Sequence, residues 1–202
     1  SVTTGMPYLL YKTAMTMDGN IATVTGHSRW VTGEESRRLV HRLRARCDAV
    51  MVGVDTVIAD NPQLTVRHVK GRDPLRVIVD TRLRTPESVN VLNGSHTSKT
   101  VIATCETNTD IHQRYLSQGA DILVCREYDG RVEMTDLLHK LAVRGVQSIL
   151  VEGGSRLAGD LLQHNLIDEC IFFYAPKVVG NGFAPFAIQG ISTMDEAIQL
   201  EV

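Results

Sequence analysis

The sequence predicts an α/β fold with a mostly parallel central sheet flanked by helices. Short apolar runs rich in β-branched residues alternate along the chain with amphipathic segments long enough for helices. Strands that are apolar on both faces are typical of a parallel sheet covered by helices on both sides. With 202 residues, the chain is expected to form a single domain over 1–202, large enough for a substantial core.

The N-terminal part is expected to contain two strands joined by a turn. Residues 7–14 are predicted as the first strand and residues 21–23 as a short second one. Asp18-Gly19 between them is a strong turn dipeptide. A polar loop follows and ends on Trp30, the only tryptophan of the chain.

The first helix is predicted over residues 33–46. Thr32 is the expected N-cap, and Glu35, three residues later, completes a capping box. One apolar stripe recurs every four positions, at Leu39, Leu43 and Cys47. Arginines occupy the other faces, and most of them are expected to lie in solvent. An arginine of this helix that pointed into a cleft would be a good anion ligand.

The rest of the chain is predicted to alternate strands and helices. The expected strands are 48–52, 75–79, 100–104, 121–125, 148–152, 169–175 and 198–202, with a short extended piece at 64–67. The expected helices are a short one at 53–61 and longer ones at 110–118, 134–143 and 156–164. Pro62 and Gly119 are plausible stops for two of these helices, and residues 87–98 are expected to form a loop.

Composition argues against several classes of function. The formal net charge of −2 gives no support to a nucleic-acid surface. The apolar runs are far shorter than a bilayer span, so no membrane association is expected. The four cysteines and seven histidines are scattered without metal-ligand spacing. The cysteines are therefore expected to be reduced and structural, no metal site is expected, and a cytoplasmic location fits.

The most informative stretch runs from Ser148 to Asp160. It predicts a buried strand that stops at Glu152, turns on Gly153 and Gly154, and enters a helix at Ser155. Such a turn offers free backbone N–H groups to an anion, and the glycines would let a pyrophosphate approach closely. The alternative is a tight turn that binds no ligand.

Glu152 ends this buried strand and is a candidate ligand-binding group. A buried carboxylate needs partners, and one that faces a cleft suits the N–H groups of a heterocycle. The alternative is a structural bond to the backbone of a neighbouring loop. Ligands of open α/β sheets bind beyond the carboxyl ends of strands, and polar or glycine-rich chemistry follows Val52, Val79 and Val151.

Two further groups of residues could hold phosphates. Thr81, Arg82 and Arg84 follow a strand end, where a hydroxyl and two guanidinium groups would suit the 2′-phosphate that separates NADP from NAD. A solvated basic loop is the alternative. A second set would hold a substrate phosphate, although spacing alone does not bring its members together: Ser28, Arg44 and Arg67.

The order of these motifs resembles the riboflavin-biosynthesis reductases. That family comprises the C-terminal reductase domain of the bacterial bifunctional deaminase–reductase and its stand-alone archaeal and fungal relatives. The matching stretches cover nearly the whole chain and are 12–22, 26–32, 43–45, 52–67, 76–80, 151–154 and 175–177.

The resemblance implies a dihydrofolate-reductase-like fold, NADPH as cofactor, and reduction of the ribose of a phosphoribosylaminopyrimidine to a ribityl chain. It assigns NADPH contacts to Ala14, Trp30, Thr56, Asp60, Thr81, Gly154, Ser155, Arg156, Leu157, Ala158, Gly159 and Asp160. It assigns substrate contacts to Ser28, Arg44, Leu64, Arg67 and Glu152. Hydride would pass to C1′ of an opened ribose, with Asp60 as the first candidate for proton transfer and Lys12 as the second.

The chain departs from the family pattern in two respects, and one of its loops bears on the substrate. Family chains usually continue for another strand or two beyond Val202, and the zinc-containing deaminase domain is absent, so an excised domain and a stand-alone reductase both fit. The loop with Trp30 resembles the bacterial form, which favours 5-amino-6-(5-phosphoribosylamino)uracil over the diaminopyrimidine of the archaeal and fungal enzymes. A dihydrofolate reductase and a non-catalytic nucleotide-binding domain are the rival functions. The family is typically dimeric, so a homodimer is expected.

Overall fold

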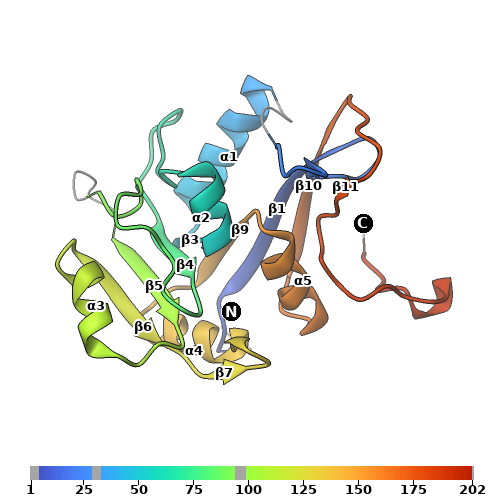
Figure 1. Ribbon diagram of the computed structural model, residues 1–202. Coiled ribbons are helices and arrows are strands. Elements are labelled where there is room, and N and C mark those ends of the chain that lie inside the picture. Colours follow the sequence, from blue (N-terminus) through green and yellow to red (C-terminus); the bar gives the residue numbers. More distant parts are fainter. Residues whose placement is uncertain (1–4, 29–32, 94–98, 202) are drawn as a thin grey trace.

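The computed structural model describes residues 5–28, 33–93 and 99–201 (Figure 1). The main sheet contains seven strands: β1 (Tyr8–Thr16), β3 (Ala49–Gly53), β4 (Leu75–Val79), β5 (Thr100–Thr104), β6 (Ala120–Val124), β9 (Ser148–Glu152) and β10 (Glu169–Ala175). The α-helices of the described residues are α1 (Glu34–Arg46), α2 (Val54–Asp60), α3 (Thr109–Leu116), α4 (Met134–Val143) and α5 (Ser155–Gln163). None of these helices is both long and apolar enough to cross a membrane.

The main sheet has the strand order β10-β1-β9-β3-β4-β5-β6, and every neighbouring pair is parallel. The predicted α/β fold with a parallel sheet is therefore confirmed. β9 comes late in the chain yet lies between β1 and β3. This insertion brings the stretch around Glu152 to the middle of the sheet, where loops from both halves of the chain surround it.

Helices cover both faces of the sheet. On one face, Leu10 and Leu150 pack with Leu43 of α1 and with Cys47, the residue that caps its C-terminal end, and α2 and α3 cover the strands further along. The opposite face packs against α4 and α5, with Leu137 buried among strand residues. Because side chains alternate between faces along a strand, Lys12 and Glu152 share the α1 face with Leu10 and Leu150.

Two small antiparallel pairs lie outside the main sheet. β2 (Ala22–Thr23) pairs with β11 (Gly182–Phe183), and β7 (Glu127–Tyr128) pairs with β8 (Arg131–Val132). A 3₁₀ turn, η1 (Met194–Glu196), lies near the C-terminal end. Of these elements only the strand at β2 was predicted, because two-residue strands are too short to show a hydrophobic period.

Most predicted elements are confirmed, and several have the bounds expected from the sequence: 75–79, 100–104, 134–143, 148–152 and 169–175. The strand predicted at 198–202 is wrong over its described residues, which are exposed and pair with no strand. The extended piece at 64–67 forms no strand either, because Leu64 adopts a left-handed conformation with φ of 56°. Thr32 lies outside the described residues, and Gly33 occupies the N-cap position of α1.

Candidate active site

The carboxyl ends of β3, β4 and β9 meet at one edge of the sheet, as expected for parallel strands. The last pair between β1 and β9 joins Lys12 to Glu152. β1 continues to Thr16 beside β10 alone. The chain of β9 turns away at Gly153, so the far end of β1 borders this edge without a partner from β9.

The glycine turn after Glu152 has the backbone conformation that its sequence predicts. Gly153 and Gly154 have φ of 71° and 82°, a left-handed region in which glycine pays no steric cost. A Cβ atom added to either glycine would lie 3.5 Å from Oγ1 of Thr56. The structure thus places Thr56 of α2 against the turn, immediately before α5 begins at Ser155.

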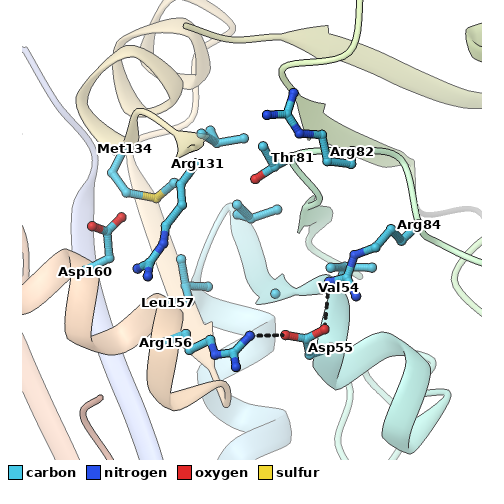
Figure 2. A pocket seen from close by; sticks show the side chains of 13 residues that line it. Val54, Asp55, Thr81, Arg82, Arg84, Arg131, Met134, Arg156, Leu157 and Asp160 are labelled. Carbon is cyan, nitrogen blue, oxygen red and sulfur yellow. Dashed lines mark hydrogen bonds and ion pairs between the residues drawn. The ribbon is translucent and has the colours of Figure 1, made fainter. Parts of the chain in front are cut away.

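A cavity of about 180 Å³ lies beside this turn, among β4, the start of α2, α5 and the β7–β8 hairpin (Figure 2). Its apolar lining includes Val54, Val79 and Leu157. Its charged lining consists of four arginines and two aspartates: Arg82, Arg84, Arg131, Arg156, Asp55 and Asp160. Guanidinium groups in excess over carboxylates, together with the Thr81 hydroxyl, form a donor set suited to phosphate.

Three of these arginines are held by acids at the cavity rim. Asp55 lies 2.7 Å from Arg84 and 3.6 Å from Arg156, and Arg82 lies 2.8 Å from Glu127. All of these side chains are more than a third exposed. Exposed ion pairs contribute only about 0–1 kcal/mol, so an entering phosphate can take over the guanidinium groups at little cost.

A different charged cluster lies on the α1 face of the sheet. Arg44 donates from Nε and Nη2 to the two carboxylate oxygens of Glu152, at 2.6 and 2.9 Å, and from Nη1 to the backbone oxygen of Thr65 at 3.0 Å. The Arg44 and Glu152 side chains are only 10% and 13% exposed. Burial is the largest single effect on the pKa of Glu152 and would raise it, but the charge and hydrogen bonds of Arg44, together with the charge of Lys12, outweigh burial, so the pKa is lowered. Glu152 is therefore a buried, ionised and rigidly oriented carboxylate.

Lys12 and His41 surround this ion pair. Burial lowers the pKa of Lys12, although the Glu152 carboxylate opposes that effect. Burial, followed by the charge of Arg44, lowers the pKa of His41 to about 4, so this imidazole is neutral near pH 7. Its Nδ1 accepts a hydrogen bond of 3.0 Å from the backbone N–H of Arg67. Lys12 is thus the group of this cluster best suited to move a proton.

The structure places seven of the predicted site residues at these two places. Thr81, Arg156, Leu157 and Asp160 line the cavity. Arg44 and Glu152 are in direct contact, with Lys12 next to Glu152 in the sheet. Arg67 is exposed, and the nearby Arg44 charge contributes, after burial, to lowering its pKa. Ala14 and Ser28 are half-buried, and Trp30 lies outside the described residues.

Other predicted residues do not face the cavity. Ala158 is fully buried in the core. Gly159 packs against a neighbouring segment so closely that an added Cβ would lie 2.5 Å from the backbone oxygen of Ala187. The backbone oxygen of Ser155 accepts a hydrogen bond from the N–H of the same Ala187. The resemblance assigned the whole run Gly154–Asp160 to NADPH, but successive helical residues point in different directions, so only some members of this run line the cavity.

Leu64 and Asp60, predicted for substrate binding and proton transfer, also lie outside the cavity lining. The Leu64 side chain is 2% exposed and belongs to the core, so any ligand contact would have to use its backbone. Asp60 is exposed at the last residue of α2, whereas Val54 and Asp55 at the first turn line the cavity. Asp60 therefore does not join the cavity lining.

Several cavity residues were not anticipated from the sequence. Arg131 and Val132 enter from the β7–β8 hairpin and Met134 from the start of α4. The dipeptide Asp129-Gly130, a strong hairpin signal, could have located the first two. Among the described residues, no group of three or more His, Cys, Asp or Glu side chains is arranged to hold a metal ion.

Known proteins resemble this chain over nearly its full length. A family model described as the RibD C-terminal domain matches residues 7–201. The riboflavin biosynthesis protein RibD of Actinobacillus pleuropneumoniae is 39% identical over 100% of this chain and 54% of its own length. The 2,5-diamino-6-ribosylamino-4(3H)-pyrimidinone 5′-phosphate reductase of Methanothermobacter thermautotrophicus is 41% identical over 97% of this chain and 91% of its own length.

A solved structure supports the same relationship. The diaminohydroxyphosphoribosylaminopyrimidine deaminase/5-amino-6-(5-phosphoribosylamino)uracil reductase of Thermotoga maritima superposes with a TM-score of 0.81 at 31% identity, over 98% of this chain and 52% of that one. The chain thus spans about half the length of these bacterial relatives. With this fold and these matches, the chain belongs to the RibD C-terminal domain family, the dihydrofolate-reductase-like oxidoreductases of riboflavin biosynthesis.

Proposed function

We propose that this chain uses NADPH to reduce the ribose of 5-amino-6-(5-phosphoribosylamino)uracil to a ribityl chain. The observation that carries the proposal is the junction at Glu152-Gly153-Gly154. On one side of this turn lies a cavity rich in arginine. On the other side lies a buried carboxylate fixed by Arg44. Two ligands of different chemistry would therefore meet at one turn.

The arginine-rich cavity fits a phosphorylated dinucleotide. Thr81, Arg82 and Arg84 would hold the 2′-phosphate, while the backbone N–H groups after Gly153 would hold the pyrophosphate. Thr56, which lies against the turn, would limit how far the dinucleotide can shift. When bound, NADPH would supply the hydride.

The Arg44–Glu152 pair fits the recognition of a pyrimidine. Each carboxylate oxygen accepts one bond from Arg44 and retains a second lone pair that can accept a ring N–H. Because three Arg44 donors already serve Glu152 and Thr65, we assign Arg44 to holding Glu152 in place. We therefore assign binding of the substrate phosphate to the guanidinium group of Arg67 and the hydroxyl of Ser28.

Lys12 is our first candidate for proton transfer, ahead of Asp60. Opening the ribose breaks the bond between C1′ and the ring oxygen, forms a C1′=N bond, and requires a proton on that oxygen. Lys12 lies beside Glu152 in the sheet, and its pKa is lowered by burial. Both features suit a proton donor next to the pyrimidine site.

The diaminopyrimidinone phosphate is the second candidate substrate. The archaeal relative whose name carries that substrate is 41% identical and is covered over 91% of its length. The two pyrimidines differ at C2, and the Arg44–Glu152 pair by itself does not favour either. A homodimer and a fused deaminase domain stay predictions.

The test is oxidation of NADPH by the purified chain, followed by absorbance, with each pyrimidine and with dihydrofolate. We expect turnover with the uracil compound at the highest kcat/KM. Turnover only with the diamino compound would make that compound the substrate in place of the uracil compound. Turnover with dihydrofolate alone, or saturable NADPH binding without turnover of any pyrimidine, would refute the proposal.

A further inference from the structure

The β7–β8 hairpin is an addition to the main sheet that forms one wall of the cavity. Its turn residues Asp129 and Gly130 have φ of 49° and 71°, the paired left-handed conformations of a type I′ turn. Tyr128 pairs with Arg131 and Glu127 with Val132. A hairpin of this size is marginal alone, so its position must be set by contacts at its base.

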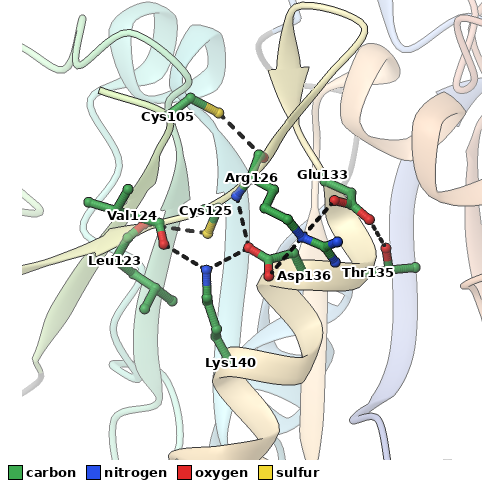
Figure 3. Close-up of polar contacts among 9 residues, drawn as sticks. All are labelled: Cys105, Leu123, Val124, Cys125, Arg126, Glu133, Thr135, Asp136 and Lys140. Atoms are coloured by element: carbon green, nitrogen blue, oxygen red, sulfur yellow. Dashed lines mark hydrogen bonds and ion pairs between the residues drawn. The ribbon is translucent and has the colours of Figure 1, made fainter. Parts of the chain in front are cut away.

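Those contacts come from the start of α4 (Figure 3). The Asp136 carboxylate accepts from the backbone N–H of Arg126 at 2.9 Å, from Arg126 Nε at 3.3 Å and from Lys140 Nζ at 2.6 Å. Glu133 lies 3.1 Å from Arg126 Nε. Lys140 also donates to the backbone oxygen of Val124 at 2.9 Å. The chain entering the hairpin is thus tied to the helix that follows it.

From this base the hairpin contacts the cavity lining through two charged side chains. Glu127 pairs with Arg82. Arg131 points into the cavity toward Asp160 (Figure 2). Burial raises the pKa of Asp160, whereas the positive charges of His164 and Arg131 oppose that rise. Val132 is 1% exposed, so the strand that carries Arg131 is anchored in the core.

Arg131 differs from the other cavity arginines in its partners. Arg82, Arg84 and Arg156 each form an ion pair with a carboxylate. Arg131 forms no ion pair with any residue that the structure describes. It is also exposed to solvent. Its planar set of N–H donors is therefore available to an entering anion without displacing an acid.

We propose that Arg131 is a further specificity-determining residue, which acts together with Thr81, Arg82 and Arg84 of the same cavity to select a dinucleotide carrying a phosphate on its adenosine ribose. This inference rests on the proposed use of NADPH. A guanidinium group on a fixed strand can bind a dianionic phosphate through two charge-assisted hydrogen bonds. A ribose hydroxyl at the same place would gain much less. We assign Asp160 no direct part in this contact, because its carboxylate would repel the phosphate.

The test measures binding of 2′,5′-ADP and of 5′-AMP by calorimetry, with no turnover required. Arg131→Gln is expected to weaken 2′,5′-ADP by about tenfold or more, the loss typical of charge-assisted hydrogen bonds, and to leave 5′-AMP within about twofold. Arg131→Lys keeps the positive charge but loses the paired N–H donors of the guanidinium group, so its affinity for 2′,5′-ADP is expected to lie between those of the unaltered chain and Arg131→Gln. Arg144→Gln is the matched control, because it removes the same charge from a surface pair with Asp121 outside the cavity.

The outcomes separate this inference from the proposed function. If the unaltered chain binds 2′,5′-ADP and NADPH but Arg131→Gln binds 2′,5′-ADP equally well, Arg131 does not read the phosphate and only this inference is overturned. If the unaltered chain prefers neither 2′,5′-ADP nor NADPH over the unphosphorylated forms, both proposals are overturned. Equal losses in Arg131→Gln and Arg144→Gln would show a general charge effect and would also overturn the inference.

Discussion

Glu152→Gln is the substitution that tests the buried ion pair most directly. It keeps the size of the side chain and one hydrogen-bond acceptor, but it removes the charge that balances Arg44. Both side chains are nearly buried, at 10% and 13% exposed. The guanidinium of Arg44 would then be left as an uncompensated charge in the interior.

The expected cost follows from that burial. Removing one partner of a buried ion pair typically costs about 3–5 kcal/mol. Because glutamine preserves one of the two bonds, at 2.6 or 2.9 Å, we expect the free energy of unfolding to fall by about 3 kcal/mol. The depressed pKa of Glu152 adds a pH dependence. The contribution is present above the usual carboxyl pKa and is lost as the pH falls below it.

Urea unfolding followed by circular dichroism gives this free energy directly. Glu34→Gln is the matched control, because its pair with Arg38 is 66% and 60% exposed and should cost at most about 0.5 kcal/mol. A loss for Glu152→Gln that is no larger than the control's would refute the reasoning. NADPH binding, measured on the same samples, is expected to be nearly unchanged, because Glu152 does not line the arginine-rich cavity.

Three further predictions follow from neighbouring features. Arg67→Ala is expected to raise the KM for substrate by about tenfold without weakening NADPH binding; steady-state kinetics with an unchanged KM would contradict the phosphate anchor. The folded state holds His41 at a pKa of about 4 against the ordinary 6.5. As the pH falls from 6.5 to 4, the unfolded state therefore binds a proton that the folded state does not, and the free energy of unfolding should fall by about 3 kcal/mol. In His41→Gln, urea unfolding at several pH values should show most of this pH dependence lost. Gly159→Ala would place a Cβ 2.5 Å from the backbone oxygen of Ala187 and should cost about 1–3 kcal/mol in urea unfolding, whereas Gly190→Ala, with open space around it, should not show this loss.

The elements predicted best are those whose signal lies in the local sequence. Buried strands such as β4 and β9 are short, mostly apolar runs, and α4 has a regular apolar stripe, so their bounds match the prediction. The 198–202 strand failed because a short apolar alternation forms a strand only where a neighbouring edge accepts it. In the described structure no such edge reaches these residues.

The side chains that α1 buries differ from those that its hydrophobic periodicity predicts. The predicted stripe of Leu39, Leu43 and Cys47 is only partly correct, since Leu39 is half-buried and His41 and Arg44 are buried. Most arginines of this helix were expected in solvent, and Arg44 was predicted to contact a substrate phosphate. It is buried because Glu152, 108 residues later in the chain, provides a carboxylate for it. A hydrophobicity pattern contains no information about such a partner.

The sequence by itself determined the α/β class, most strands and helices, and the glycine turn at Gly153 and Gly154, because each depends on the conformational preferences of adjacent residues. The family resemblance added the two sets of ligand-binding residues. Only the tertiary structure decided that Arg44 serves Glu152, that Ala158 and Gly159 face away from the cavity, and that Arg131 enters it. Those outcomes depend on contacts between residues far apart in the chain: the insertion of β9 between β1 and β3 brings Glu152 to Arg44, and the ties between α4 and the β7–β8 hairpin position Arg131.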